Sequence, residues 1–304
     1  MQRDPFSIFE GWLQEWVSVK EINGFPITPR NSESLVSVWP QYQGKLNPND
    51  APFLLLAMVF RLDINPGRNA AGEFRFVYGV TDPRNGEPLP FTSIFEYALP
   101  LTEKFPTILH WANAIHALRE LPYGERFNDV LQTLTDELPA FPLRVRTNDM
   151  LLDSEWEMRE FEFQSENKLV NVTTSQTPAP IFDEEQKQVL IDWISGHEME
   201  ILKGQYQLPK NFLSGAAPVP DESYSWLTTS ELTEPLRKQF SLNTCNGCHS
   251  GDTLTRFLHV EPRRSGSEPI ISDYLNSDLE RRAAFVKQLL CREPELKSYS
   301  NLTH

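Results

Sequence analysis

The sequence predicts an α+β fold in which an antiparallel sheet is flanked by helices. Three runs between residues 53 and 99 have the composition and spacing of β-strands, and turn residues separate them. Segments with helical spacing dominate the C-terminal part. We therefore expect an α+β body over residues 1–175 and a mostly helical part over residues 176–304, divided at the Ser/Thr/Pro-rich stretch 173–179.

The first 50 residues predict one helix and a long connection. Apolar residues recur with helical spacing from Phe6 to Lys20, and Asp4-Pro5 ahead of them is a natural helix start. Residues 23–50 are rich in proline and polar residues, but large apolar side chains interrupt them. We expect an ordered loop that covers part of the core.

Three adjacent antiparallel strands are expected next. Residues 53–62 are almost all apolar and too few for an ordinary buried helix, which predicts a central strand. Residues 73–80 and 91–99 alternate between apolar and other side chains, and the turn sequence Thr81–Gly86 lies between them.

The helical and strand periodicities of the apolar residues predict further elements. We expect helices at 105–121 and 125–138, strands at 143–151 and 155–165, and then helices at 183–203, 230–240 (capped by Ser230) and 278–290. Within the strand at 155–165 the apolar positions change parity near Arg159, which indicates either a bulge or a strand buried on both faces. Its glutamates, Glu155 to Glu162, predict a solvent-facing side.

Composition excludes several classes of function. The chain has 42 acidic and 28 basic residues and a net charge of −14, a balance that repels phosphate backbones, so nucleic acid is not an expected partner. No run of about 18 apolar residues occurs, so we expect no transmembrane span. The motifs of serine hydrolases, phosphate loops, dinucleotide-binding folds and His-Glu-x-x-His proteases are absent from the sequence.

One pentapeptide near the C-terminal end carries recognisable chemistry. It reads Cys245-Asn246-Gly247-Cys248-His249 and contains two of the three cysteines. Cys-x-x-Cys-His is the attachment sequence of a c-type haem. Its two thiols, a helical turn apart, add across the two vinyl groups of one porphyrin, and the histidine binds the iron. We therefore expect a covalently attached haem c in a cytochrome c-like C-terminal part.

Three other interpretations of the pentapeptide stay open. Its cysteines are also suited to a structural disulfide of an exported protein, or to a redox dithiol, which leaves the histidine unexplained. A zinc site is the third alternative, although the sequence has no second Cys-x-x-Cys. Its ligands would be Cys245, Cys248, His259 and either His249 or Cys291. If Cys291 is not a zinc ligand, we expect it to be a buried packing residue.

A bound haem would need further contacts. His259 follows His249 by ten residues and is our first choice as the sixth iron ligand. The alternative is that this histidine has a purely structural role. A methionine ligand and an open sixth position are the alternatives. Arg256 and Arg263, in a basic loop of an acidic chain, are expected to pair with the haem propionates, next to a solvated role for the loop.

The segment Phe240 to Arg263 resembles the C-terminal segment of an uncharacterised family of exported bacterial proteins, often lipoproteins. That family carries Asn-Thr-Cys-x-x-Cys-His followed by Phe-x-His, here Asn243 to His249 and Phe257 to His259. Its N-terminal portion is similar to Ala51–Val80. The resemblance implies an exported setting and haem attachment at the pentapeptide, but no activity. The first residues of this chain do not form a leader, so we expect a mature region.

Together these observations predict a haem c protein of the bacterial cell envelope. It would transfer electrons, or provide a redox centre to a partner protein that docks on the α+β body. The alternative is an exported interaction module whose Cys-x-x-Cys is a disulfide or zinc clip. The sequence does not show whether the protein is an enzyme, and it leaves the partner and the oligomeric state undetermined.

Overall fold

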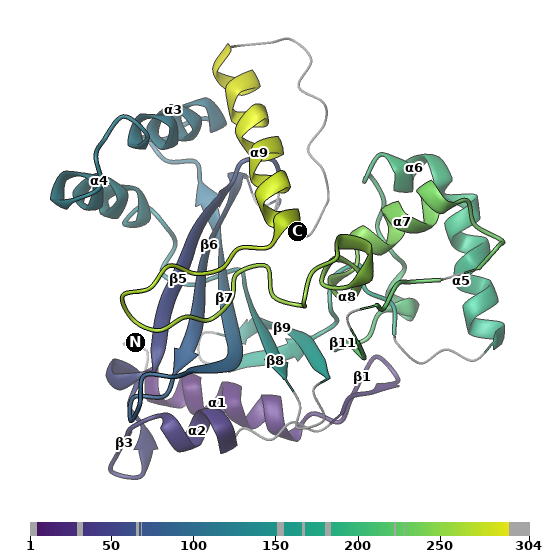
Figure 1. The fold of residues 1–304 in the computed structure, drawn as a ribbon, viewed down its shortest axis with the longest axis horizontal. Coiled ribbons are helices and arrows are strands. Elements are labelled where there is room, and N and C mark those ends of the chain that lie inside the picture. Colours follow the sequence, from purple (N-terminus) through teal and green to yellow (C-terminus); the bar gives the residue numbers. More distant parts are fainter. Residues whose placement is uncertain are drawn as a thin grey trace.

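The computed structural model describes residues 5–28, 33–64, 67, 69–150, 155–165, 168–179, 184–221, 223–227 and 229–291. In this part of the chain one large antiparallel sheet is packed against helices (Figure 1). The prediction of an α+β fold with an antiparallel sheet and flanking helices is confirmed.

The main sheet follows the order β10-β9-β8-β7-β6-β5, with β11 paired to β9. Its strands are β5 (Phe53–Arg61), β6 (Ala70–Thr81), β7 (Pro88–Pro100), β8 (Arg144–Met150), β9 (Trp156–Ser165), β10 (Lys168–Val172) and β11 (Ala217–Val219). The first five match the strands expected from periodicity. The short β10 and β11 were not predicted.

Strand β5 lies at the edge of the sheet, so the prediction of a central strand was wrong. The C-terminal segment nevertheless covers part of this edge. Leu56 packs with Val260 in one small cluster, and Arg263 Nη2 donates to the carbonyl oxygen of Leu55 at 3.1 Å. A covered edge removes the need for a further strand.

Strand β9 is buried on both faces, which was one of the two expected explanations of its parity change. It pairs with β8 without a register shift from Trp156 to Phe161. The prediction that its glutamates face solvent was wrong for Glu157 and Glu160, which are 3% and 0% exposed. Both carboxylates are paired with buried arginines instead.

The N-terminal helix α1 (Pro5–Ser18) covers one end of the sheet. Trp12 makes an edge-to-face contact with Phe161 of β9, and Trp16 makes one with Phe91 of β7. The expected loop at 23–50 is largely structured. It contains β1 (Glu21–Ile22), β2 (Phe25–Pro26), α2 (Glu33–Val38), β3 (Gln41–Tyr42), β4 (Lys45–Leu46) and the short 3-10 helix η1 (Pro48–Asp50).

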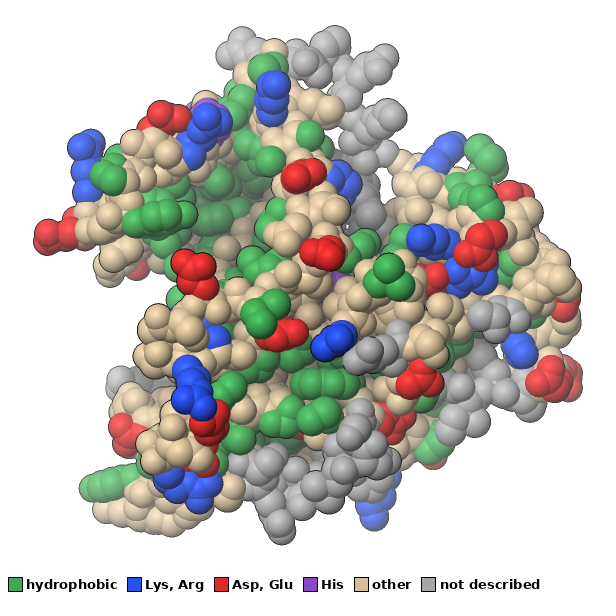
Figure 2. Space-filling view, viewed as in Figure 1, with side chains coloured by type: hydrophobic (Ala, Val, Ile, Leu, Met, Phe, Trp, Pro, Cys, Tyr) green, Lys and Arg blue, Asp and Glu red, His purple; other side chains and the backbone are tan. Residues whose placement is uncertain are grey.

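Helices α3 (Ile108–Leu118) and α4 (Glu125–Thr135) match the predicted pair and lie at the opposite end from α1 (Figure 1). They share a hydrophobic cluster with β6, β7 and the end of α9 (Asp273–Cys291). Figure 2 shows hydrophobic side chains in the recess between these helices and the sheet, and acidic side chains interspersed with basic ones elsewhere on that face.

The C-terminal part contains α5 (Glu184–Gly196), α6 (Glu198–Leu202), the 3-10 helix η2 (Lys210–Phe212), α7 (Glu234–Leu242), α8 (Cys245–Cys248), the 3-10 helix η3 (Gly251–Thr253) and α9. The helix expected at 183–203 is interrupted at His197, and the N-cap of α7 is Thr233 rather than Ser230. These elements give no support to a cytochrome c-like arrangement.

Between η3 and α9 the chain runs across the sheet and returns (Figure 1). This covering segment (residues 254–272) and the first turns of α9 enclose the polar face of the sheet. Among the described helices, none is both long and apolar enough to cross a membrane.

Candidate ligand-binding site

The face of the sheet beneath the covering segment carries a row of charged side chains. Because directly paired residues of antiparallel strands project to the same side, the register determines which of them meet. Arg75 of β6 is opposite Glu96 of β7, and Arg146 of β8 is opposite Glu160 of β9. Strand periodicity therefore builds a charged layer across four neighbouring strands.

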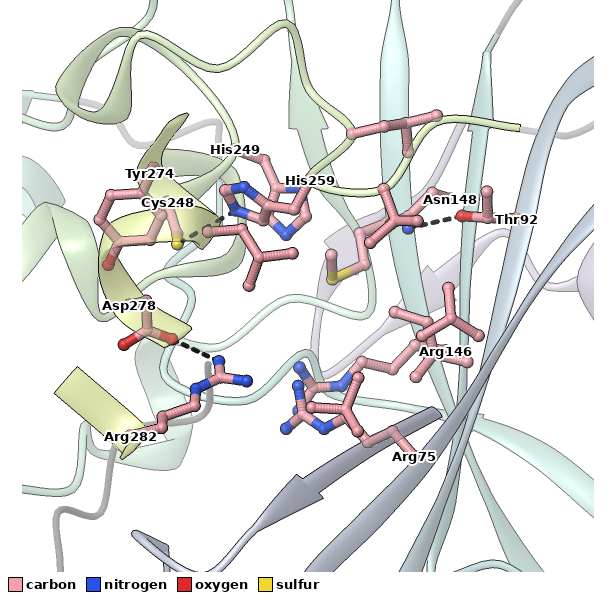
Figure 3. Close-up of a pocket in the computed structure, with 17 residues that line it drawn as sticks. Arg75, Thr92, Arg146, Asn148, Cys248, His249, His259, Tyr274, Asp278 and Arg282 are labelled. Carbon is pink, nitrogen blue, oxygen red and sulfur yellow. Dashed lines mark hydrogen bonds and ion pairs between the residues drawn. The ribbon is translucent and has the colours of Figure 1, made fainter. Parts of the chain in front are cut away.

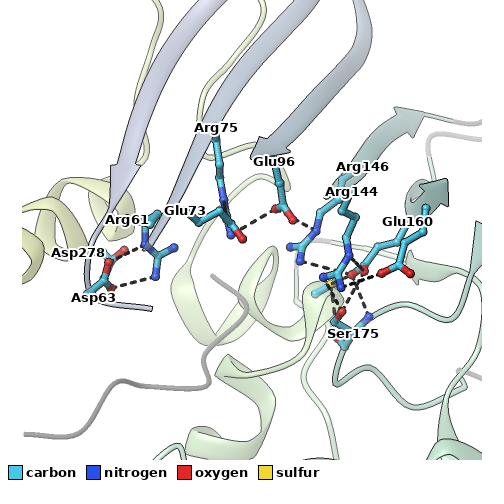
Figure 4. Close-up of polar contacts among 12 residues, drawn as sticks. Arg61, Asp63, Glu73, Arg75, Glu96, Arg144, Arg146, Glu160, Ser175 and Asp278 are labelled. Atoms are coloured by element: carbon cyan, nitrogen blue, oxygen red, sulfur yellow. Dashed lines mark hydrogen bonds and ion pairs between the residues drawn. The ribbon is translucent and has the colours of Figure 1, made fainter. Parts of the chain in front are cut away.

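These side chains form one continuous network (Figure 4). Glu96 Oε1 forms ion pairs with Arg75 and Arg146, each with a nitrogen–oxygen distance of 3.2 Å. Glu160 lies 3.6 Å from Arg146 and 3.1 Å from Arg144. Burial alone raises the pKa of Glu160, but Arg144, Arg146 and hydrogen bonds from Ser175 outweigh it and hold that pKa below its usual value. Glu160 is therefore a buried carboxylate anion.

A pocket lies between this charged layer and the C-terminal segment (Figure 3). Its volume is about 730 Å³, including the part open to solvent. Apolar side chains from the sheet and from the covering segment form most of its wall: Val59, Val77, Ile94, Met158, Leu258, Val260 and Leu275. Three guanidinium groups, those of Arg75, Arg146 and Arg282, also line it, together with a single carboxylate, that of Asp278.

Paired arginine and aspartate side chains lie at the α9 side of the pocket. Arg61 and Arg281 both pair with Asp63, and Arg281 and Arg282 both pair with Asp278. Arg281 thus links the two aspartates. Burial, together with the nearby Arg61, lowers the pKa of Arg282 to about 10. Among the described residues, none accepts a hydrogen bond from the buried Arg282 Nε.

The opposite wall of the pocket contains part of the Cys-x-x-Cys-His sequence. The Thr244 hydroxyl caps α8 by accepting from the backbone nitrogen of Gly247 at 3.0 Å, which fixes the turn that holds both cysteines. Cys248 Sγ lies 3.6 Å from Nε2 of His259. The Nδ1 atom of His259 lies 2.9 Å from the hydroxyl oxygen of Ser272, and this contact holds the orientation of the imidazole ring.

His249 is held in a similar way. Its Nδ1 donates to the carbonyl oxygen of Phe257, which requires the proton to reside on Nδ1 and leaves the lone pair on Nε2. Burial, reinforced by Arg146 and Arg75, lowers the pKa of His249 to about 4. The pKa of His259 is also lowered, first by burial and then by His249 and Arg282. Both imidazoles are neutral at physiological pH, and their ring centroids are 4.3 Å apart.

Cys245 points away from the pocket. Its fully buried thiol lies 3.8 Å from Glu160 Oε1 and 3.9 Å from the carbonyl oxygen of Ser175. Burial raises the pKa of Cys245 and that of Cys248 to about 12, so both thiols stay protonated. All three cysteines are free thiols. Cys291, expected to be buried, is exposed at the end of α9.

The two arginines predicted for this site are elsewhere. Arg256 is exposed, and Arg263 binds the edge of β5 through Leu55. Neither lines the pocket. The pocket arginines come instead from β6, β8 and α9. Their only signal in the sequence was the alternation of charged with apolar residues along the strands, which usually marks a solvent-facing side.

The described residues do not fit a covalently attached haem. Both thiols must reach the edge of one porphyrin, yet Cys245 and Cys248 face different surroundings. Two imidazoles on opposite sides of one iron would have ring centroids roughly 6 Å apart, given metal–nitrogen bonds of about 2 Å. Those of His249 and His259 are only 4.3 Å apart. Phe257 and His259 pack directly on His249, where the porphyrin would lie.

A preformed metal site is not present either. In the ranges that the structure describes, no three His, Cys, Asp or Glu side chains are already arranged as a metal-binding group. Of the predicted zinc ligands, Cys248, His249 and His259 lie together, whereas Cys245 faces Glu160.

No protein-family model, curated protein or solved structure matches the chain. The family resemblance drawn from the pentapeptide therefore stays a prediction. The same holds for the exported location and the redox partner that were inferred with it.

Proposed function

We propose that this protein binds a small organic anion with an apolar body in the pocket beneath the covering segment. The observation that carries the proposal is the environment of Arg282. Its side chain is 11% exposed and lines an otherwise mainly apolar cavity, where burial and the nearby Arg61 disfavour its positive charge and lower its pKa. A bound carboxylate would balance this charge.

The lining of the pocket supports the same conclusion. Small-molecule sites usually combine apolar walls with a few polar groups. A guanidinium binds a carboxylate through two parallel hydrogen bonds, and such a pair is strong where water is excluded. Val77, Ile94 and Val260 offer contact to the apolar body of the ligand.

Arg75 and Arg146 have a different role from Arg282 in this proposal. Both are already paired with carboxylates of the charged layer. They add to the positive field in the pocket, as their effect on the pKa of His249 indicates. Asn148, whose amide donates to Thr92 at 2.8 Å, provides a neutral polar group in the same pocket.

The proposal concerns binding rather than catalysis. A nucleophilic cysteine needs a thiol with a lowered pKa or an adjacent base that accepts its proton. The pKa of Cys248 is raised to about 12 by burial. That of its neighbour His259 is lowered, so proton transfer between the two is unfavourable.

Calorimetric titration with straight-chain carboxylates of about six to ten carbons tests the proposal. We expect binding of the acids and at least tenfold weaker binding of the corresponding amides, which lack the charge. Arg282→Gln should weaken carboxylate binding at least tenfold, equal to about 1.4 kcal/mol. Arg119→Gln, at an exposed ion pair beside the C-terminal end of α3, is the matched control and should bind normally. Equal binding of acids and amides, or unchanged binding by Arg282→Gln, would contradict the proposal.

Electron transfer through a haem c is the second candidate, together with the cytochrome c-like role of residues 176–304. It is favoured by the pentapeptide and by the hydrogen bond from His249 Nδ1, which orients the ring as in many metal-binding histidines. It requires Phe257–His259 to move off His249. Protein produced with a haem-attachment system would then show a Soret band that survives denaturation. The anion proposal predicts no such band.

A further inference from the structure

We infer that the ligand of this pocket carries a hydroxyl group at the end of its apolar body opposite the carboxylate, and that Asn148 binds this hydroxyl. The inference rests on the anion proposal, in which Arg282 binds the carboxylate, and it names the ligand class as an unbranched hydroxy acid. The polar pair of Thr92 and Asn148, which lines the pocket away from Arg282, is the observation behind it (Figure 3).

The strand register places this polar pair in the pocket wall. Thr92 of β7 lies directly opposite Asn148 of β8, and Asn148 lies opposite Met158 of β9. Residues paired in this way project to the same side of the sheet, and all three line the pocket. Thr92 is 1% exposed and Asn148 is 2% exposed. The pair is therefore a buried part of the pocket that the backbone holds in place.

Only half of the Asn148 amide is used within the protein. Its Nδ2 atom donates to the hydroxyl oxygen of Thr92 at 2.8 Å. Among the residues with a described position, none donates a hydrogen bond to Asn148 Oδ1. A buried amide oxygen without a donor is unfavourable, and folded proteins seldom leave one in that state. In a pocket wall, such an oxygen is suited to a donor that belongs to the ligand.

Arg282 and Asn148 lie at different sides of the pocket. The neighbour of Arg282 on α9, Arg281, pairs with Asp63 just beyond β5, whereas Asn148 belongs to β8. Three strand spacings separate β5 from β8, which is roughly 14 Å across the sheet, or the length of an extended chain of about ten carbons. Apolar side chains of the strands in between line the floor: Val59, Val77 and Ile94. This arrangement fits an unbranched chain with one polar group at each end.

The charges near Asn148 select a hydroxyl among the possible end groups. A second carboxylate would present acceptor oxygens to Asn148 Oδ1, which is itself an acceptor. An ammonium group would lie close to the guanidinium of Arg146, which lines the same pocket two residues earlier on β8. A hydroxyl is neutral and donates one hydrogen bond, so it satisfies the amide oxygen without adding charge.

Calorimetric titration of the full-length chain with decanoate and with its terminally hydroxylated form tests the inference. We expect the hydroxy acid to bind roughly fivefold more tightly or better, because only this acid supplies the donor. Arg282→Gln should weaken binding of both acids by the same factor and keep the preference. The double variant Thr92→Val with Asn148→Leu replaces both members of the polar pair, so neither is left without its partner. It should bind the two acids equally.

Asn128→Leu, at an exposed position on α4, is the matched control and should keep the preference for the hydroxy acid. Circular dichroism establishes that each variant is folded. Equal binding of the two acids by the unaltered protein, or a preference that survives in the double variant, overturns the hydroxyl inference and leaves the anion proposal standing. Binding of neither acid by the unaltered protein overturns both.

Discussion

Arg146 and Glu160 face each other across β8 and β9, with their charged atoms 3.6 Å apart and both side chains buried beneath the pocket. Together with Arg144, Arg75 and Glu96 they form the charged layer. This layer lines one side of the pocket, and the covering segment packs on apolar residues of the same sheet.

Glu160→Gln is therefore expected to destabilise the fold strongly. It leaves Arg146 with Glu96 alone and Arg144 with the half-exposed Glu162 alone, and removal of one member of a buried pair costs about 3–5 kcal/mol. Glu162→Gln, on the same strand but 40% exposed, should change the free energy of unfolding by less than about 1 kcal/mol. Urea denaturation measures both, and equal effects of the two substitutions would refute a buried charged layer.

The Glu160 carboxylate also predicts that the protein loses stability in acid. The pKa of Glu160 is lowered in the folded protein, so the stabilisation it provides is complete above the ordinary glutamate range and is lost as the pH falls through the folded value. The free energy of unfolding should decrease as the pH is lowered below about 4.5. In Glu160→Gln this decrease should be shallower, and a parallel decrease in both proteins would contradict the assignment.

Gly247→Ala should disrupt the turn that carries the cysteines. A Cβ atom at this position would overlap the backbone oxygen and hydroxyl of Ser241 and would lie 2.6 Å from the hydroxyl of Thr244. We expect a loss of about 1–3 kcal/mol in the free energy of unfolding. Gly196→Ala, where the new methyl group meets open space, should be neutral or slightly stabilising. Thermal denaturation of the two variants compares them directly, and a stable Gly247→Ala protein would mean that the packing around α8 is looser than described.

The three thiols should differ in reactivity. Cys291 is exposed, whereas Cys245 and Cys248 are fully buried, and burial raises the pKa of both. Brief treatment of the folded protein with iodoacetamide should label Cys291 alone, and labelling of the other two should require denaturant. Peptide mass spectrometry identifies the labelled sites. Rapid labelling of Cys248 in the folded protein would show that it is an accessible, reactive thiol.

The sheet was predictable because its signals are local. Alternation along β6 and β7, and the turn after Thr81, fix strand positions without knowledge of the rest of the chain. The edge position of β5 was not predictable, because burial by the covering segment and burial by a further strand give the same apolar sequence. Contacts between residues 55 and 263 are distant in sequence and leave no periodic signal.

The site was only partly predictable for a related reason. The pentapeptide correctly indicated a helical turn and brought attention to His249 and His259, which do lie together. It could not show that Cys245 faces Glu160, or that Phe257 packs on His249. The glutamates of β9 were assigned to solvent because a charged strand face is normally exposed. Glu157 pairs with Arg159 of its own strand, whereas the arginines that match Glu160 lie on β8 and only the register brings them together.

A crystal structure of the protein with a carboxylate that carries bromine on its terminal carbon tests the central claim most directly. We predict an anomalous bromine peak among Val77, Ile94 and Val260 and the carboxylate within hydrogen-bond distance of Arg282. A pocket without the ligand at saturating concentration, or a carboxylate directed away from Arg282, would contradict the account.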